Sequence, residues 1–158
     1  MSPASSFNTD KGGVVTHFLV DKDGVVSQCA SLLEYTYHIG KIKARCKEEG
    51  NCSVEEKKTI DGFGWAPKKL HDHEKEYSDR YPINNDSVGI EVVGAYNSTT
   101  KVWDTVTKEQ EESIALIIKI LKENYKLEDQ DIYEHDKISY KTEGEGAGLY
   151  SPNAHSNN

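Results

Sequence analysis

The stretch VVTHFLVDKDGVVSQC, residues 14–29, decides the first element of the fold. Both of its ends are rich in β-branched or aromatic residues, which is typical of β-strands. Between them, Asp21-Lys22-Asp23-Gly24 is a turn sequence, because aspartate bonds nearby backbone groups and glycine accepts left-handed dihedral angles. Residues 14–29 are therefore predicted to form a β-hairpin.

A further strand is predicted at residues 87–94, SVGIEVVG, where nearly every position except Glu91 is apolar or glycine. A continuous apolar strand is usually covered on both faces. The clearest helix follows at residues 108–125. Thr107 and Gln110 match a capping box at its start, and one face carries a row of apolar side chains: Ile114, Ile117, Ile118 and Leu121.

Less regular segments complete the chain. A short strand is predicted at residues 131–135 and a short charged helix at residues 41–49. Residues 50–86 are polar and rich in turn residues, so we expect a long surface excursion with a helix around Lys68–Arg80. Strands, helix and strand in this order predict an α/β fold, a single domain with a central mixed β-sheet flanked by helices.

The length of 158 residues predicts one domain that can bury a core. The polar, small residues 1–12 are expected to form a flexible leader. Residues 13–150 are expected to form the domain, and residues 151–158 a flexible tail.

Composition restricts the partners. The net charge of -8 argues against nucleic acid, because phosphate binding needs a basic stripe. A mean hydropathy of -0.72 indicates a well-hydrated surface. No apolar run approaches the ~20 residues that cross a bilayer, so no membrane insertion is expected. Residues 1–13 lack the apolar segment of a secretory signal, so no signal peptide is expected.

The three cysteines are Cys29, Cys46 and Cys52. The segment between Cys46 and Cys52 contains Gly50 and is short but closable, so a disulfide and two reduced thiols are both compatible with the spacing. A zinc ribbon is disfavoured because there is no second cysteine pair. Cys29 lies in a predicted strand and is expected to be a small core residue rather than a nucleophile.

Two places combine reactive groups. Glu91 is a carboxylate in an apolar strand, and burial raises the pKa of a carboxyl group toward the range of a general acid or base. His135 is followed by Lys141, Glu143 and Glu145. Imidazole and carboxylate groups are suitable zinc ligands, and an ammonium can stabilise an oxyanion. The alternatives are a strand-end glutamate facing solvent and an ordinary surface loop.

The remaining histidines give weaker signals. His38 fits a functional site or a hydrogen-bonded structural residue. His71 and His73 lie in a charged run and are expected to be solvated, and His155 lies in the polar tail.

Four segments resemble, in order, motifs of the type 2 N-acetylmuramoyl-L-alanine amidases, whose fold the peptidoglycan-recognition proteins share. They are the hairpin sequence THFLVDKDG (16–24), the aromatic-His-x-Gly motif YHIG (37–40), the strand NDSVGIE (85–91) and the closing segment HDKISYKTE (135–143). The likeness covers roughly residues 13–150. The segment from Arg45 to Cys52 also resembles amidase domains of interbacterial effectors.

The resemblance implies a zinc-dependent hydrolase that cuts the bond between N-acetylmuramic acid and the L-alanine of the stem peptide. His135 would be a zinc ligand. Glu91 would be the general base that activates water, and Lys141 would stabilise the tetrahedral oxyanion. Zn²⁺ would lower the pKa of water and polarise the scissile carbonyl. His38 would line the substrate groove, and His17 matches the family's hairpin histidine, so both are expected to bind substrate.

Two features depart from the family pattern. The last ligand is Glu143 or Glu145, since relatives differ in its spacing from the lysine. The family's first ligand is a histidine upstream of the hairpin, whereas no histidine precedes His17. The alternative function is therefore a module of the same fold that binds peptidoglycan without cutting it.

The resemblance also implies partners and a place of action. Peptidoglycan is the expected partner, with an immunity or delivery protein as a further one. The protein is expected to act on the cell wall, in the periplasm or outside the cell, after delivery by phage lysis or a secretion system. A disulfide between Cys46 and Cys52 would favour the periplasm.

Overall fold

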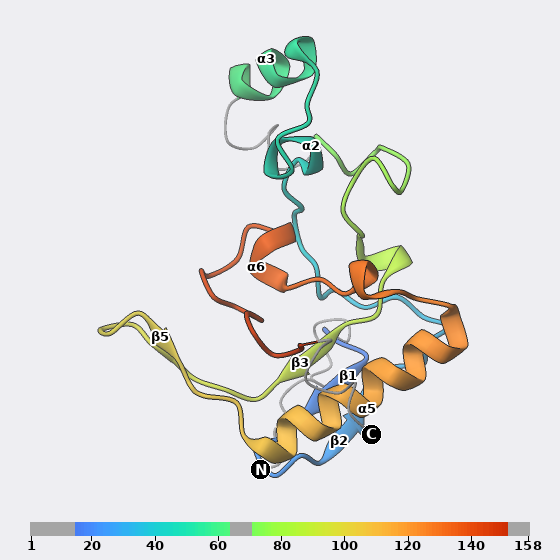
Figure 1. Cartoon of the computed structure of the whole chain (residues 1–158), viewed down its shortest axis with the longest axis vertical. Helices are drawn as coiled ribbons and strands as arrows, with labels where there is room; N and C mark the ends of the chain where they lie inside the picture. Colours follow the sequence, from blue (N-terminus) through green and yellow to red (C-terminus); the bar gives the residue numbers. More distant parts are fainter. Residues whose placement is uncertain (1–14, 64–70, 152–158) are drawn as a thin grey trace.

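The computed structural model describes residues 15–63 and 71–151, and its centre is a three-stranded mixed sheet of order β2-β1-β3. Strand β1 (Phe18–Val20) pairs antiparallel with β2 (Val26–Gln28). It pairs parallel with β3 (Ile90–Val92), which lies beside it in Figure 1. The predicted hairpin and the predicted α/β fold with a mixed sheet are therefore confirmed.

The long helix α5 (Lys108–Tyr125) covers one face of this sheet (Figure 1). It begins with the predicted capping box, in which the Thr107 hydroxyl accepts from the Gln110 backbone and the Gln110 side chain accepts from Thr107. The apolar face of the helix packs on Val20 to form the main core. Burying such side chains contributes about 1.5–3 kcal/mol each. The buried helix residues are those predicted: Ile114, Ile117, Ile118 and Leu121.

Two polar side chains of α5 form hydrogen bonds to the backbone around the sheet and so fix the position of the helix. The Gln110 side-chain amide, which is fully buried, donates to the Val93 carbonyl oxygen at 2.9 Å. The Ser113 hydroxyl donates to the carbonyl oxygen of Gly24 at 2.6 Å. Gly24 has φ +79°, and a Cβ there would lie 2.7 Å from the Glu109 carbonyl oxygen, so the turn and the helix meet only because this residue is glycine.

A second, smaller core lies on the other side of the sheet from α5. It consists of Ile39, Ile42, Tyr81 and Ile138, the last of which belongs to the short helix α6 (His135–Ile138). An isolated antiparallel bridge between Ile42 and Ser139 fastens α6 to the segment after residue 38.

The strand predicted at residues 131–135 is wrong. Residues 129–131 form a 3-10 helix, η2 (Asp129–Asp131), in which the Asp131 carboxylate accepts from the Glu128 amide and the Asp131 amide donates to the Glu128 carbonyl oxygen. This local capping competes with an extended conformation. His135 then begins α6 instead of ending a strand.

Residues 43–80 form a region that we call the insert, of which the structure describes 43–63 and 71–80. It contains α2 (Arg45–Glu48), within the range predicted as a charged helix, and α3 (Val54–Gly62), which was not predicted. The helix predicted around Lys68–Arg80 is absent from residues 71–80, which form turns, and its first residues lie outside the described part. Figure 1 shows α2 and α3 far from the sheet.

The remaining elements are short. Strands β4 (Tyr96–Asn97) and β5 (Val102–Trp103) form a projecting hairpin, and η1 (Asn84–Asp86) precedes β3. Among the described residues, no helix is both long and apolar enough to cross a membrane. The expected leader (1–12) and nearly all of the expected tail (151–158), including His155, lie outside the described residues.

Candidate functional site

Glu91 points away from α5 because successive side chains of a strand alternate between its faces. Ile90 and Val92 pack against the core under α5, so Glu91 projects from the opposite face. There it is half-buried. Burial raises the pKa of Glu91, with a smaller raising effect from Glu145, while the charges of His135 and Lys141 act to lower it. The strand thus presents a carboxylate of raised pKa to the residues that follow α6.

His135, the first residue of α6, has one ring nitrogen held by the backbone. Its Nε2 lies 3.3 Å from the carbonyl oxygen of Ile39. A carbonyl only accepts, so Nε2 carries the proton. The other nitrogen, Nδ1, lies 3.2 Å from the Glu145 carboxylate. Two lone-pair donors face each other across this gap, and either a proton or a cation between them makes the contact favourable.

The loop after α6 carries Glu145 back to His135. Glu145 lies between Gly144 (φ +80°) and Gly146 (φ +84°), both in the left-handed region that side chains disfavour. The buried Asp136 accepts from the Gly144 amide at 2.8 Å, and its own amide donates to the Glu145 carbonyl oxygen. The loop is therefore held from both sides, with Glu145 at its turn.

The two glutamates that the sequence left open lie in different places. The Glu145 side chain is half-buried against His135. Glu143 is exposed, and its backbone carbonyl accepts from the Trp103 indole at 3.1 Å. The structure brings Glu145, and not the Glu143 carboxylate, into contact with His135.

Lys141 completes the group. Its ammonium lies 3.8 Å from the Glu145 carboxylate. A Cβ placed on Gly40 would lie 3.9 Å from the lysine side chain, so the segment after His38 runs beside it. A flexible ammonium at this edge can reach a developing negative charge near Glu91.

His17 and His38 form a buried hydrogen-bonded network behind this face of the sheet. His17 Nε2 donates to the Glu34 carbonyl oxygen at 2.9 Å, and its Nδ1 accepts from the Gly89 amide at 3.1 Å. His38 Nε2 lies 2.9 Å from the Ser87 hydroxyl. A Cβ on Gly89 would lie 2.6 Å from the His38 ring, so only glycine fits. Both rings support the strand that carries Glu91.

Burial lowers the pKa of His38 to about 4, and the nearby His17 acts in the same direction. At neutral pH this imidazole is therefore uncharged. The Thr36 hydroxyl contacts it at 2.8 Å. His38 therefore adds no positive charge beside Lys141.

The donor set fits a zinc ion in part. His135 Nδ1 faces the Glu145 carboxylate, and the Ile39 contact orients the ring as outer-shell partners of zinc histidines do. Catalytic zinc sites normally use three protein ligands. Within residues 15–63 and 71–151, the groups of three candidate ligand atoms that lie close together do not include His135. Two such ligands, His135 Nδ1 and the Glu145 carboxylate, lie together here.

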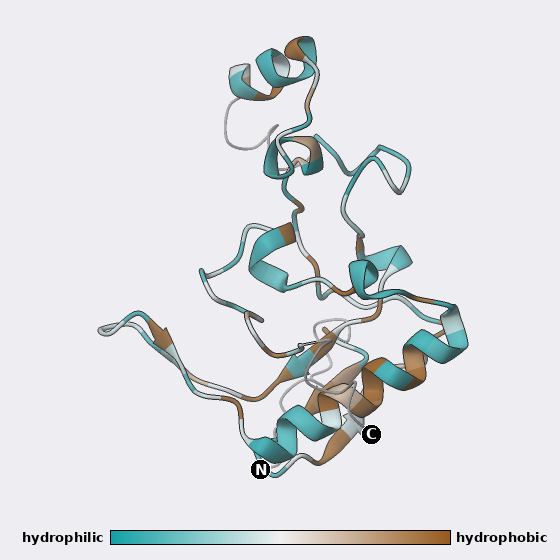
Figure 2. Cartoon of the chain, viewed as in Figure 1, coloured by the Kyte–Doolittle hydropathy of each residue, from teal (hydrophilic) through white to brown (hydrophobic). Residues whose placement is uncertain are grey.

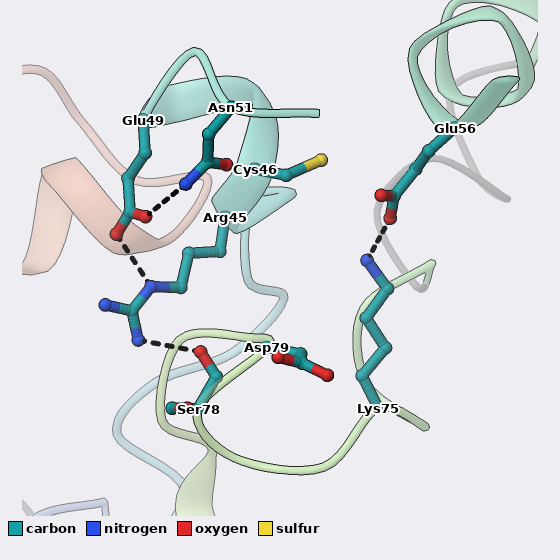
Figure 3. A pocket seen from close by; sticks show the side chains of 8 residues that line it. All are labelled: Arg45, Cys46, Glu49, Asn51, Glu56, Lys75, Ser78 and Asp79. Carbon is teal, nitrogen blue, oxygen red and sulfur yellow. Dashed lines mark hydrogen bonds and ion pairs between the residues drawn. The ribbon is translucent and has the colours of Figure 1, made fainter. Parts of the chain in front are cut away.

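A pocket of about 330 Å³ lies elsewhere, in the insert (Figure 3). Its lining is polar and contains none of the predicted site residues: Arg45, Cys46, Glu49, Asn51, Glu56, Lys75, Ser78 and Asp79.

The structure also settles the state of two cysteines and the burial of two histidines in or near this pocket. Cys46 and Cys52 form a disulfide. His71 and His73 are half-buried and not solvated: the His71 ring contacts the Phe63 ring, and His73 accepts from the Ile42 amide.

Cys29 is not one of the buried core residues, contrary to the expectation. It is half-buried just after β2, and its thiol contacts the Ser27 carbonyl oxygen at 3.7 Å. Burial raises the pKa of Cys29, which keeps the thiol protonated and unreactive.

A family model described as N-acetylmuramoyl-L-alanine amidase matches residues 2–147. The matched range includes both the strand that carries Glu91 and the loop that carries Lys141 and Glu145. No curated protein and no solved structure matches the chain.

Proposed function

Because the chain belongs to the N-acetylmuramoyl-L-alanine amidase family, we propose that it hydrolyses the amide bond between N-acetylmuramic acid and the L-alanine of the stem peptide. The family acts on peptidoglycan as a hydrolase. The observation that carries the proposal is the convergence of Glu91 with His135, Lys141 and Glu145 on one face of the sheet.

Each group has a chemical task in this proposal. Glu91, whose pKa burial raises, takes a proton from the attacking water and passes it to the departing nitrogen. Lys141 donates to the oxyanion that forms on the scissile carbonyl. His17 and His38 contribute to substrate binding by holding Gly89, and with it β3, in place.

His135 Nδ1 and the Glu145 carboxylate would hold Zn²⁺, with Glu143 the less favourable alternative because it is exposed. Zinc bound there supplies Lewis-acid polarisation of the scissile carbonyl. Support comes from the orientation of His135 by the Ile39 carbonyl, which leaves Nδ1 available.

A second candidate is a recognition module that binds peptidoglycan without cutting it. The observation that favours it is the presence of only two of three expected zinc donors at His135 among the described residues. Glu91 and Lys141 argue for the enzyme, because a binding surface has no use for a half-buried base beside an ammonium.

The test is release of stem peptide from intact sacculi by the wild-type chain and by Glu91→Gln. We expect a loss of roughly 100-fold or more, since general-base catalysis contributes about that much. Unchanged binding to sacculi and an unchanged circular dichroism spectrum would exclude a folding defect. Release by the variant at the wild-type rate would remove Glu91 from the mechanism, and no release by either would favour the recognition module.

Metal analysis tests the ligands separately. Glu145→Gln should lower the zinc content of the purified chain, and Glu143→Gln is the matched control on the same loop. If Glu143→Gln loses zinc and Glu145→Gln keeps it, the proposed ligand is wrong. The routes of delivery and an immunity or delivery protein as partner stay predictions from the sequence.

A further inference from the structure

We propose that reduction of the Cys46–Cys52 disulfide converts the insert into a second zinc site, with Cys46, Cys52, Glu56 and His71 as ligands. Candidate ligand atoms of Cys46, Cys52 and Glu56 lie within 4.8 Å of one another, and so do those of Glu56, His71 and Asp72. Glu56 belongs to both groups and links them into one cluster. The cluster is separate from Glu91 and His135.

His71 shows that the cluster has an unfilled position. Its Nε2 is buried and has no hydrogen-bond partner among the described residues. A buried nitrogen left in this way is unfavourable, and a bound metal would satisfy it. The same atom lies 3.9 Å from the Glu56 carboxylate. In a tetrahedral zinc site the ligand atoms are about 3.3–3.8 Å apart, so His71 and Glu56 are already near that separation.

Asp72 lies near the place of the outer-shell acceptor that zinc histidines usually have. Its side chain is fully buried, and one oxygen accepts from the Arg45 amide at 2.8 Å. The other oxygen lies 3.9 Å from His71 Nδ1. With Nδ1 facing Asp72 and Nε2 facing Glu56, the imidazole is oriented to bind a metal through Nε2.

A cation already occupies part of this space. The Lys75 ammonium pairs with Glu56 and lies 2.8 Å from the buried Asp72 oxygen. Figure 3 shows the Glu56–Lys75 pair, with the Cys46 sulfur extending toward it across the pocket. The pocket gives an ion a path from solvent. Zn²⁺ would displace Lys75 from Glu56.

The redox step balances as follows. A dithiol reductant supplies two electrons and two protons, closing into its own disulfide while Cys46 and Cys52 become thiols. Zn²⁺ binding releases both protons. Two thiolates beside Glu56 and Asp72 would repel one another unless a dication lay among them. The insert is thereby cross-linked by sulfur when oxidised and by zinc when reduced.

The experiment uses Co²⁺ as a probe on the full chain, either oxidised or reduced with a phosphine that does not bind the metal through sulfur. The reduced protein should show a thiolate-to-cobalt charge-transfer band that Zn²⁺ abolishes, and the oxidised protein should show none. Glu145→Gln and His135→Ala should keep the band, which separates this site from the proposed catalytic one. Absence of the band from the reduced wild type overturns the proposal.

Variants test the ligand set. His71→Asn should weaken Co²⁺ binding roughly tenfold or more, whereas His73→Asn, the matched control, should leave it unchanged. Lys75→Met should tighten binding because it removes the competing ammonium. Equal affinities of His71→Asn and the wild type, or weaker binding by Lys75→Met, would contradict the assignment. Cys29→Ser should keep the band.

Discussion

The sheet with α5 and the insert are held together by different forces. Figure 2 shows apolar residues gathered on α5 and the strands, whereas the insert is mostly hydrophilic. The core under α5 contains five buried apolar residues. Within the described part of the insert, Ala44 and Ile60 are the buried apolar residues. The insert instead uses the disulfide and ion pairs such as those of Lys75 with Glu56 and Asp72.

This difference indicates which region supplies most of the stability of the fold. Burying an apolar side chain contributes about 1.5–3 kcal/mol and is not screened by salt, whereas ion pairs near the surface contribute about 0–1 kcal/mol each and are screened. The region that positions Glu91 therefore carries the fold, and the insert is a locally stabilised attachment. Each of the following changes acts mainly on one of the two regions.

The largest effect is expected from Ile114→Ala in α5. Ile114 is 2% exposed, and emptying such a site usually destabilises a protein by about 2–5 kcal/mol. Denaturant unfolding should show a loss of about 3 kcal/mol. Leu116→Ala on the exposed side of the same helix is the control and should change stability little, since Leu116 is 58% exposed. Equal losses would mean that α5 does not pack as described.

The second effect is expected from acidification, which should lower the stability of the region around the sheet. The pKa of His38 is lowered to about 4 in the folded chain, mainly by burial, and is about 6.5 when unfolded. Between these values the unfolded state binds more protons, so stability is fully present above pH 6.5 and falls as the pH drops toward 4. The loss should be about 3 kcal/mol, because each unit of difference in pKa corresponds to about 1.4 kcal/mol.

The check is the difference in unfolding free energy between the wild type and His38→Gln at several pH values. The variant should have a flatter dependence between pH 4 and 6.5, whatever its absolute stability. Parallel curves would show that His38 does not titrate in this way.

Removing the disulfide should act on the insert alone. Cys46→Ser with Cys52→Ser should lower stability by roughly 1–2 kcal/mol in metal-free buffer, because the closed loop is short. Hydrogen exchange should speed up in α2 and α3 and stay unchanged in α5. Faster exchange in α5 would show that the two regions unfold together.

The smallest effect is expected from salt. Raising ionic strength from about 0.01 to 1 M shortens the screening length from about 30 to 3 Å. Protection of the insert amides should fall by less than about threefold, because pairs such as Lys57–Asp61 are exposed. Protection in β1 and β3 should not fall. A larger loss in the strands than in the insert would reverse the comparison.

Local signals decided which elements could be predicted. The α5 bounds follow from the capping box at Thr107 and the periodic apolar face, both written in adjacent residues. The signal for α3 was also local but missed: Ser53 accepts from the Glu56 amide at its start. The capping of η2 by the Asp131 carboxylate, which accepts from the Glu128 amide, likewise overrode the strand-like composition after it.

The sequence indicated which types of residue form the candidate site but not how they are arranged in space. Glu91 stood out because an acid in an apolar strand is unusual. The choice between Glu143 and Glu145 depends on the backbone path of the loop, with glycines on both sides of Glu145 in the left-handed region. The cluster around Glu56 has no regular ligand spacing, so the sequence gave no sign of it.

The parallel pairing of β1 with β3 sets the order in which the chain can fold. Phe18 pairs with Ile90, so the whole insert lies within the loop that must close before the sheet exists. The entropy of closing such a loop grows only with the logarithm of its length, about 0.6 kcal/mol for each doubling. Lengthening or trimming the insert would therefore change the equilibrium stability of the sheet very little. It would change the folding rate more, because pairing of distant segments is the slow step.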